Sequence, residues 1–477
     1  MERIASLLQR NRHYAAGCAF LMPAVLALLN LVGEAGPADN AIFAYLGHCV
    51  GEGAVPYLEL WDTKGPLQFW LNALGMLGGR VGHTLLGVAV AWVMLLCLLR
   101  AWGRWYGATA AAWVLPAVAV YAAYADGGTR GNMTEAYALA VAAGVLCLQS
   151  ISARGLWVAA AQGLSVGCLL MLKGNYIGPG VWLAACWWMQ GEFGLRRVVA
   201  AAGGFLLGVG VPLAVIAGQG AFADYLDACF RYTSLEYNRG TPYFLCLVLH
   251  LYRTLPWLTL PVLCLLPLLL RSLRRVSVPT RAAALWFAVE VAATSTADSF
   301  YPHYLVPAVL PGFMTALGLW HSGVLRGGAL RAAIAAMAVG PLCLGIYLLR
   351  VQRHNLWVGA PEAEAAAQVA RRFGPQPVVL LGGSAVCRAA LAGDMLTANR
   401  YIVGLSHYLQ TQNPERRRQI ALDAAAAMRR PGVRLLLAET PPEQLPYMQT
   451  PEFAEAVAAW RPILCAGNIW FYEKKAP

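Results

Sequence analysis

The chain is dominated by apolar runs that are long enough to cross a lipid bilayer. A helix needs about 20 mostly apolar residues to span the hydrocarbon core, and we place about eleven such runs between residues 1 and 350. They lie near 14–32, 83–99, 106–124, 133–150, 156–172, 175–190, 197–218, 243–270, 282–297, 303–320 and 332–350. Of the 477 residues, 59% are hydrophobic and only 13% are charged, whereas soluble domains carry about 25% charged residues. The sequence therefore predicts an α-helical polytopic membrane protein.

Charged residues divide the loops between these runs into two alternating sets. Arginines dominate one set. The other set carries most of the acidic residues and comprises 33–82, 125–132, 173–175, 219–241 and 298–302. Lysine and arginine mark the cytoplasmic side of a membrane protein, so we expect the acidic loops to face outward. Because the basic residues lie in short loops beside the bilayer, the net charge of +12 does not indicate a nucleic-acid partner.

The composition changes after about residue 351. The pattern there predicts helices and strands in turn, at 361–373, 377–381, 414–429, 433–438 and 462–472. These elements suggest a small α/β domain at 351–477, and an odd number of spans in the membrane domain 1–350 would place it outside the cytoplasm. Gly382-Gly-Ser384 follows the first strand, as phosphate-binding turns do. It lacks the further glycines and the lysine of a nucleotide fingerprint, which favours a plain strand-to-helix turn.

The first outward loop, 33–82, concentrates the charged side chains of the N-terminal third. Asp39 begins a short amphipathic segment, where it would be a first-turn helix acid, a catalytic base, or both. Further on, Trp61-Asp62-Thr-Lys64-Gly-Pro66 contains the only lysine of the loop. Its ammonium would either extend to water along the membrane surface or bind a phosphate head group as a point charge. Since long ordered loops are more often functional than idle, this loop is the first place to seek chemistry.

Further candidates lie near the outward ends of later runs. Glu135 opens the fourth run and would be either a functional intramembrane acid or part of a capping box with Asn132. His303 begins a late run, although a lone histidine is more often a structural hydrogen-bonding group than a catalyst. Tyr304 fits both an interfacial aromatic belt and a platform for a sugar ring. Arg130 could help to form a cationic pocket for a phosphate leaving group. Other cations on the same side include Lys173, Arg231 and Arg239.

Taken in order, these motifs resemble the GT-C superfamily of membrane glycosyltransferases. More narrowly, the chain is similar to the protein O-mannosyltransferase and aminoarabinose-transferase group, which is glycosyltransferase family 39-like. The matching pieces are Asp39, Gly53-x-x-Pro-Tyr57, Trp61-Asp-x-Lys64-x-Pro66, Glu135, Tyr301-Pro-His303-Tyr304-Leu-Val-Pro307 and Asn399-Arg-Tyr401. The resemblance implies a GT-C-type membrane domain with a small extracytoplasmic α/β domain.

The resemblance also implies an activity. An enzyme of this kind takes a hexosyl or pentosyl group from a polyprenyl-phosphate donor and passes it, with inversion, to a hydroxyl or amine of a lipid, glycan or protein acceptor. It works on the outer face of the cytoplasmic membrane, which we expect to be a bacterial inner membrane.

By the same analogy Asp39 is the general base and Lys64 binds the carrier phosphate. His303, Arg130 and Tyr304 belong to the donor site. The candidate second carboxylates are Glu135, Asp62 and Asp126. Asn40 stands where many relatives have a second acid, which disfavours a divalent metal, and we expect no cofactor.

Two other classes of function remain open. A transporter or flippase of lipid-linked sugars would carry intramembrane charges and inverted repeats. Before residue 351 this chain instead keeps most of its acids in outward loops, and it shows no visible repeat. A non-catalytic assembly subunit would use the C-terminal domain to bind a partner.

Overall fold

The computed structural model describes residues 9–32, 38–125, 133–151, 155–236, 241–254, 256–296, 302–325, 361–374 and 376–475. The chain divides into two compact units, and each is made of separate stretches of sequence. The first, called here the helical unit, comprises Met1–Asn30, Thr84–Ala214 and Gly240–Arg353. The second, called here the mixed unit, comprises Leu31–His83, Val215–Arg239 and His354–Pro477. The predicted boundary at 350/351 falls outside the described residues and stays a prediction.

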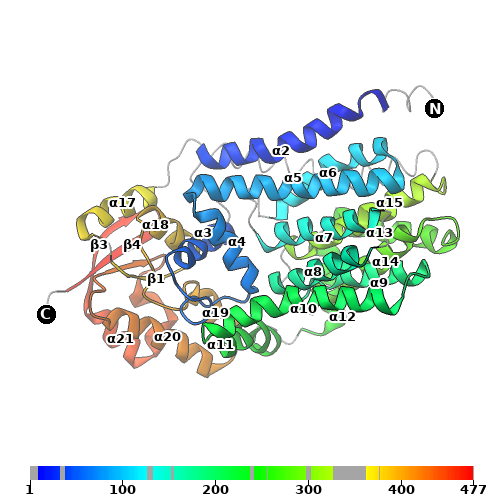
Figure 1. Ribbon diagram of the computed structural model, residues 1–477. Helices are drawn as coiled ribbons and strands as arrows, with labels where there is room; N and C mark the ends of the chain where they lie inside the picture. Colours follow the sequence, from blue (N-terminus) through cyan, green and yellow to red (C-terminus); the bar gives the residue numbers. More distant parts are fainter. Residues whose placement is uncertain are drawn as a thin grey trace. The chain divides into compact units, whose positions relative to one another are not determined.

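Apolar helices make up the described part of the helical unit (Figure 1). They are α2 (Arg12–Val32), α5 (Gly79–Tyr106), α6 (Ala108–Ala125), α7 (Thr134–Ser150), α8 (Leu156–Leu172), α9 (Gly178–Met189), α10 (Leu195–Gly218), α12 (Tyr243–Leu249), α13 (Pro256–Arg271), α14 (Val278–Thr294) and α15 (Val309–His321). A π-helix, η2 (His250–Thr254), follows α12, and a 3₁₀-helix, η3 (Pro302–Ala308), precedes α15. The prolines of the 243–270 run break it as predicted, because Pro256 starts a new helix after η2.

Within the described residues, three helices are long and apolar enough to cross a membrane: Gly79–Tyr106, Leu195–Gly218 and Tyr304–His321. Five further apolar helices are shorter, so the predicted count of about eleven spans is not established by helix length. Large apolar side chains are exposed along α5 and α10, for example Leu85 and Leu206, at 59% and 66%. Such apolar stripes would be unfavourable in water and suit contact with lipid.

Helices α8 and α10 approach each other through paired glycines. A Cβ atom added to Gly163 would lie 1.9 Å from the carbonyl oxygen of Ala201, and one added to Gly204 would lie 1.9 Å from that of Ala160. Both distances are far inside van der Waals contact. Gly167 and Gly208 repeat the arrangement one turn further along each helix. This is the small-residue packing that lets two membrane helices touch through their backbones.

The mixed unit contains a small sheet with strand order β1-β2-β4-β3. Strands β1 (Val378–Leu381) and β2 (Leu435–Ala438) are parallel and fully buried, as continuous apolar runs predict. Strands β4 (Ile469–Lys474) and β3 (Trp460–Ala466) continue the sheet as an antiparallel hairpin. The further strand predicted at 462–472 is divided into these two strands, because the chain reverses at Gly467, whose φ of 57° suits glycine.

Helices of three chain stretches complete the mixed unit. The predicted helices 361–373 and 414–429 are confirmed as α17 (Pro361–Phe373) and α20 (Pro414–Arg429). The others are α3 (Ala38–Gly51), α4 (Pro66–Met76), α11 (Phe222–Leu226), η1 (Asp227–Glu236), α18 (Ser384–Ala392), α19 (Gly404–Gln410), η4 (Pro442–Gln444), η5 (Pro446–Gln449) and α21 (Pro451–Ala458). The amphipathic segment predicted at Asp39 is α3, and its Tyr45 hydroxyl donates to the carbonyl of Met395, at 2.9 Å. Helix α3 is thus packed against the C-terminal stretch.

Candidate functional site

The turn that carries Lys64 is held by its own side chains. Tyr57 is fully buried and has a φ of 66°, a left-handed conformation that is rare for a residue with a side chain. Its N–H donates to the carbonyl of Leu60 at 2.8 Å, and its hydroxyl donates to the carbonyl of Lys64 at 2.7 Å. The N–H of Lys64 donates to Oδ1 of Asp62 at 3.0 Å. Strained backbone of this kind costs about 1–3 kcal/mol and persists where its surroundings hold it in place.

The ammonium group of Lys64 remains accessible while its backbone is fixed. Its side chain is 20% exposed, and Nζ lies 3.9 Å from Oδ1 of Asp62. Nζ also lies 5.7 Å from the ring centre of Phe43, a distance suited to a cation–π contact. The structure therefore presents a positioned cation beside one buried carboxylate.

Segment 222–236 supports this turn from another part of the chain. The thiol of Cys229 donates to the carbonyl of Lys64, at 3.4 Å. Burial raises the pKa of Cys229, so the thiol keeps the proton that this contact needs. The rings of Tyr225 and Tyr57 meet edge to face at 5.2 Å. Sequence reasoning missed Cys229, because nothing in its local pattern shows which loop it contacts.

Trp61, next to Asp62, is enclosed by aromatic and basic side chains. It is 1% exposed, and its ring lies 4.8 Å from that of Tyr232, 4.7 Å from that of His407 and 5.2 Å from that of Tyr401. Its backbone N–H donates to the carbonyl of Arg400 at 3.0 Å. Burial lowers the pKa of His407 to about 4, so this imidazole is neutral near pH 7.

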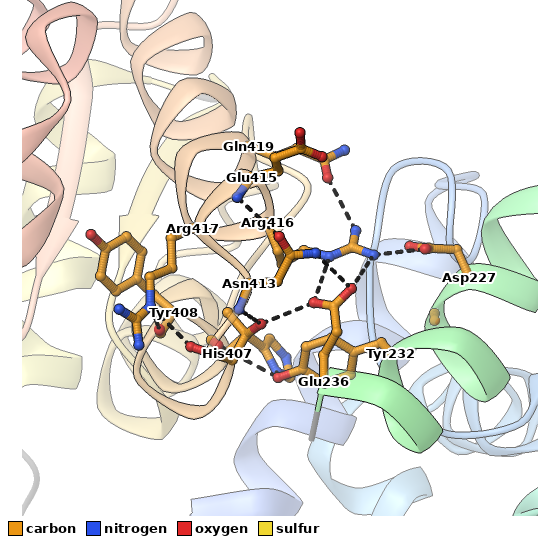
Figure 2. A network of polar contacts seen from close by, with 12 residues as sticks. Asp227, Tyr232, Glu236, His407, Tyr408, Asn413, Glu415, Arg416, Arg417 and Gln419 are labelled. Atoms are coloured by element: carbon orange, nitrogen blue, oxygen red, sulfur yellow. Dashed lines mark hydrogen bonds and ion pairs between the residues drawn. The ribbon is translucent and has the colours of Figure 1, made fainter. Parts of the chain in front are cut away.

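Arg416 is the centre of a buried polar network beside Trp61 (Figure 2). Its guanidinium donates to Oδ1 of Asp227 at 2.6 Å and to Oε2 of Glu236 at 3.3 Å. It also donates to the hydroxyl of Tyr401 and to Oε1 of Gln419. Burial alone would lower the pKa of Arg416, but the hydrogen bonds to Asp227 and Glu236 outweigh it and raise the pKa. Arg416 therefore stays charged inside the mixed unit.

A cavity of about 300 Å³ borders this network within the mixed unit. Side chains of both charges line it, including Asp224, Asp227, Glu236, Arg400 and Arg416. Much of this charge is already paired: Arg400 bridges to Asp224, and Arg416 bridges to the other two acids. The cavity is therefore polar without a dominant sign.

In the helical unit, the predicted residues Glu135 and Tyr304 meet at Lys173. Glu135 is 1% exposed, and its Oε1 accepts from Nζ of Lys173 at 3.2 Å and from the hydroxyl of Tyr176 at 2.8 Å. Nζ of Lys173 lies 4.1 Å from the ring centre of Tyr304. Because Glu135 is the second residue of α7, its carboxylate lies near a helix start, as the sequence predicted. The structure adds the lysine partner that makes its burial tolerable.

The structure describes the remaining predicted residues only by their backbone or not at all. Asp39 is the second residue of α3, in its first turn as expected, but its side chain lies outside the described part of the structure. His303 lies in η3, and its side chain is likewise outside that part. Arg130 and Asp126 are not among the described residues at all. Their predicted roles stay predictions.

The turn at Gly382-Gly-Ser384 already holds an anion from the protein itself. Oε1 of Glu439 accepts from the N–H of Ala385 at 2.9 Å and from that of Val386 at 3.4 Å, at the start of α18. A carboxylate at this place satisfies the free N–H groups of the helix. The contact supports the interpretation of a plain strand-to-helix turn.

Across the described residues, no group of three or more His, Cys, Asp or Glu side chains is arranged to hold a metal ion. The expectation that the protein needs no metal stays a prediction, since Asp126 and the side chains of Asp39 and His303 lie outside the described residues.

Comparison with known proteins gives a clear result for the fold. No protein-family model and no curated protein sequence matches the chain. Among solved structures, the chain is similar to ArnT, the aminoarabinose transferase from Cupriavidus metallidurans, bound to undecaprenyl phosphate. The TM-score is 0.63 at 15% identity, over 95% of this chain and 97% of that one.

A second similar structure is the oligosaccharyltransferase of Archaeoglobus fulgidus in its apo form. Its TM-score is 0.51 at 12% identity, over 96% of this chain and 74% of that one. Both neighbours are members of the GT-C superfamily. The protein therefore has the fold of the GT-C membrane glycosyltransferases, as the resemblance of its motifs predicted.

Proposed function

We propose that this protein is a glycosyltransferase that moves a sugar from a polyprenyl-phosphate donor to an acceptor hydroxyl or amine. The observation that carries the proposal is the Lys64 turn, in which Tyr57, Asp62 and Cys229 fix the backbone while the ammonium stays accessible. The fold supports it, because the ArnT structure of the same fold contains undecaprenyl phosphate. The apolar helices offer the surroundings that a lipid-linked donor requires.

Lys64 would bind the phosphate of the carrier. A phosphate leaving group gains negative charge as the glycosidic bond breaks, so a cation held beside it stabilises the transition state more than the ground state. The hydrogen bonds to the carbonyl and N–H of Lys64 hold its backbone before substrate binds. Little reorganisation would then be needed during the reaction. Arg130, His303 and Tyr304 keep their predicted role in donor binding.

Asp39 would be the general base that takes the proton from the acceptor. It lies in the first turn of α3, where the helix N-terminus carries partial positive charge. An alcohol attacks slowly without such a base. Attack from the face opposite the leaving phosphate would invert the anomeric carbon. Glu135, paired with Lys173, and Asp62, bonded to Lys64, would orient these cations; Asp126 remains a further candidate acid.

The acceptor would be a lipid, glycan or protein at the outer face of a bacterial inner membrane. The acidic loops, which include the Lys64 turn, would face that side. The proposed chemistry uses Lys64 where other enzymes use a divalent metal, and Asn40 stands where many relatives carry a second acid.

Proteoliposomes with a radiolabelled polyprenyl-phosphate sugar test the proposal. The wild-type protein should release the labelled sugar from its carrier onto an acceptor lipid extract. Asp39→Asn should abolish transfer while membrane insertion and donor binding persist, because the change removes a base and little volume. Normal transfer by Asp39→Asn would refute the assignment.

The same assay separates the other two classes of function. A flippase would move the intact donor across the membrane with the sugar still attached. An assembly subunit would leave the donor unchanged on both sides. Either result would replace the proposed transfer reaction.

A further inference from the structure

One guanidinium joins the two ends of a π-helix in the mixed unit. Asp227 and Glu236 are the first and last residues of η1, and Arg416 of α20 forms ion pairs with both (Figure 2). These partners lie 189 and 180 residues from Arg416 in the sequence. A π-helix is a rare and poorly stabilised form, commonly found at functional sites. A contact that joins both of its ends is therefore a direct way to keep it in shape.

Additional hydrogen bonds complete the network around Arg416. The side chains of Arg416 and Glu236 are each 6% exposed. Glu236 also accepts from the hydroxyl of Thr411 at 2.9 Å and from the amide of Asn413 at 3.3 Å. A buried ion pair is favourable only with such additional hydrogen bonds, and loss of one member leaves the others uncompensated. Removal of Arg416 should therefore loosen η1 itself, and its effect should not be limited to a contact at the surface.

The residues between the two ends of η1 contact the Lys64 turn. Cys229 donates to the carbonyl of Lys64, and Tyr232 packs on Trp61. Arg416 also reaches the turn directly, since its guanidinium carbon lies 5.7 Å from the ring centre of Trp61. Arg416 is thus connected to Trp61 and Lys64 through η1, and to Trp61 also by direct contact.

We infer that Arg416 is a positioning residue for Lys64: by joining the ends of η1 and contacting Trp61, it sets the place of the ammonium that binds the donor phosphate. This inference rests on the proposed function. It gives the C-terminal stretch a specific task, which is to hold the Lys64 turn in place.

The test uses the full-length protein in proteoliposomes and measures the KM for donor and for acceptor separately. Arg416→Gln should raise the donor KM about tenfold, which corresponds to about 1.4 kcal/mol of lost binding. The acceptor KM should not change. A merely structural defect reduces the number of active molecules and so lowers kcat without raising the donor KM. Arg416→Lys keeps the charge but cannot bridge both acids. Its donor KM should therefore lie between those of the wild type and Arg416→Gln.

Arg418→Gln is the matched control, because Arg418 lies on the same helix, is 66% exposed and pairs only with Glu452 among the ion pairs described. It should leave both KM values unchanged. If Arg416→Gln does not fold, Glu236→Gln removes one charge of the network and keeps the side-chain volume. It should raise the donor KM in the same direction by a smaller factor.

The decisive comparison is the double variant. Positioning through Lys64 requires that Arg416→Gln adds nothing to the donor KM once Lys64→Gln is present, whereas independent effects would multiply. Multiplying effects, or a loss of kcat alone, would overturn the inference while the proposed function stands. If Lys64→Gln itself leaves the donor KM unchanged, the proposed role of Lys64 in donor binding fails, and the inference fails with it.

The reactivity of the Cys229 thiol tests the positioning without an activity assay. The alkylation rate of Cys229, followed by peptide mass spectrometry, should rise about tenfold in Arg416→Gln, since a looser η1 exposes the thiol more often. It should be unchanged in Arg418→Gln. Equal rates in wild type and Arg416→Gln would show that Arg416 does not hold η1, and would overturn the inference.

Discussion

The hydroxyl of Tyr57 provides the sharpest test of how the Lys64 turn works. Tyr57→Phe deletes the 2.7 Å hydrogen bond to the carbonyl of Lys64. It keeps the edge-to-face contacts of the ring with Phe69 and Tyr225, both at 5.2 Å. A buried hydrogen bond contributes about 0.5–1.5 kcal/mol, and the cost is larger when a partner is left unsatisfied. Here the carbonyl retains the weaker thiol donor of Cys229, so we expect a loss of about 1 kcal/mol.

If that loss falls on donor binding, the donor KM should rise about fivefold. Steady-state transfer in proteoliposomes over a range of donor concentrations measures it, and thermal unfolding of the same preparation shows whether the fold is intact. Tyr408→Phe is the matched control, because its hydroxyl donates to the carbonyl of Pro446 in the same unit, away from the turn. An unchanged donor KM in Tyr57→Phe, or an equal rise in Tyr408→Phe, would refute the idea that a fixed Lys64 backbone positions the ammonium for donor binding.

Three further predictions concern packing, pH and metals. Gly204→Ala should destabilise the helical unit by about 1–3 kcal/mol or more, whereas Gly203→Ala, which has open space beside it, should be tolerated; thermal unfolding in detergent compares them. His407 is neutral in the fold with a pKa of about 4, against 6.5 ordinarily, so stability should fall as the pH drops from 6.5 towards 4 and be flat above 6.5. His407→Gln should reduce that slope in unfolding curves taken at each pH. Transfer should continue in EDTA at the untreated rate, and loss of activity that Mg²⁺ or Mn²⁺ restores would contradict a metal-free mechanism.

Local sequence patterns were sufficient for much of the C-terminal stretch. Helix α20 begins at Pro414 after the N-cap Asn413, whose side chain accepts from the N–H of Glu415, and these signals can be read from the sequence. The buried strands β1 and β2 are short apolar runs, which are equally legible. The hairpin at Gly467 was missed because the apolar residues of its two strands were taken as one run.

The site was only partly accessible from sequence. Lys64 stands out because it is the only lysine of a long acidic loop. Arg416 does not, since it is followed by Arg417 and Arg418 and the three look alike in the sequence. Only the fold distinguishes the side chain that is 6% exposed from the one that is 66% exposed. Contacts between residues more than 180 positions apart, such as that between Arg416 and Asp227, leave no local pattern to detect.

The mixed unit is assembled from three stretches of chain that are far apart in sequence, and this has a consequence for biosynthesis. Trp61 leaves the ribosome roughly 350 residues before Arg416, which at about 5–20 residues per second is a delay of roughly 20 to 70 s. During that interval the apolar ring of Trp61 has none of its C-terminal neighbours. A chaperone or the membrane surface would shield it until the last stretch is made, and a chain that stops before that stretch would leave Trp61 without these neighbours.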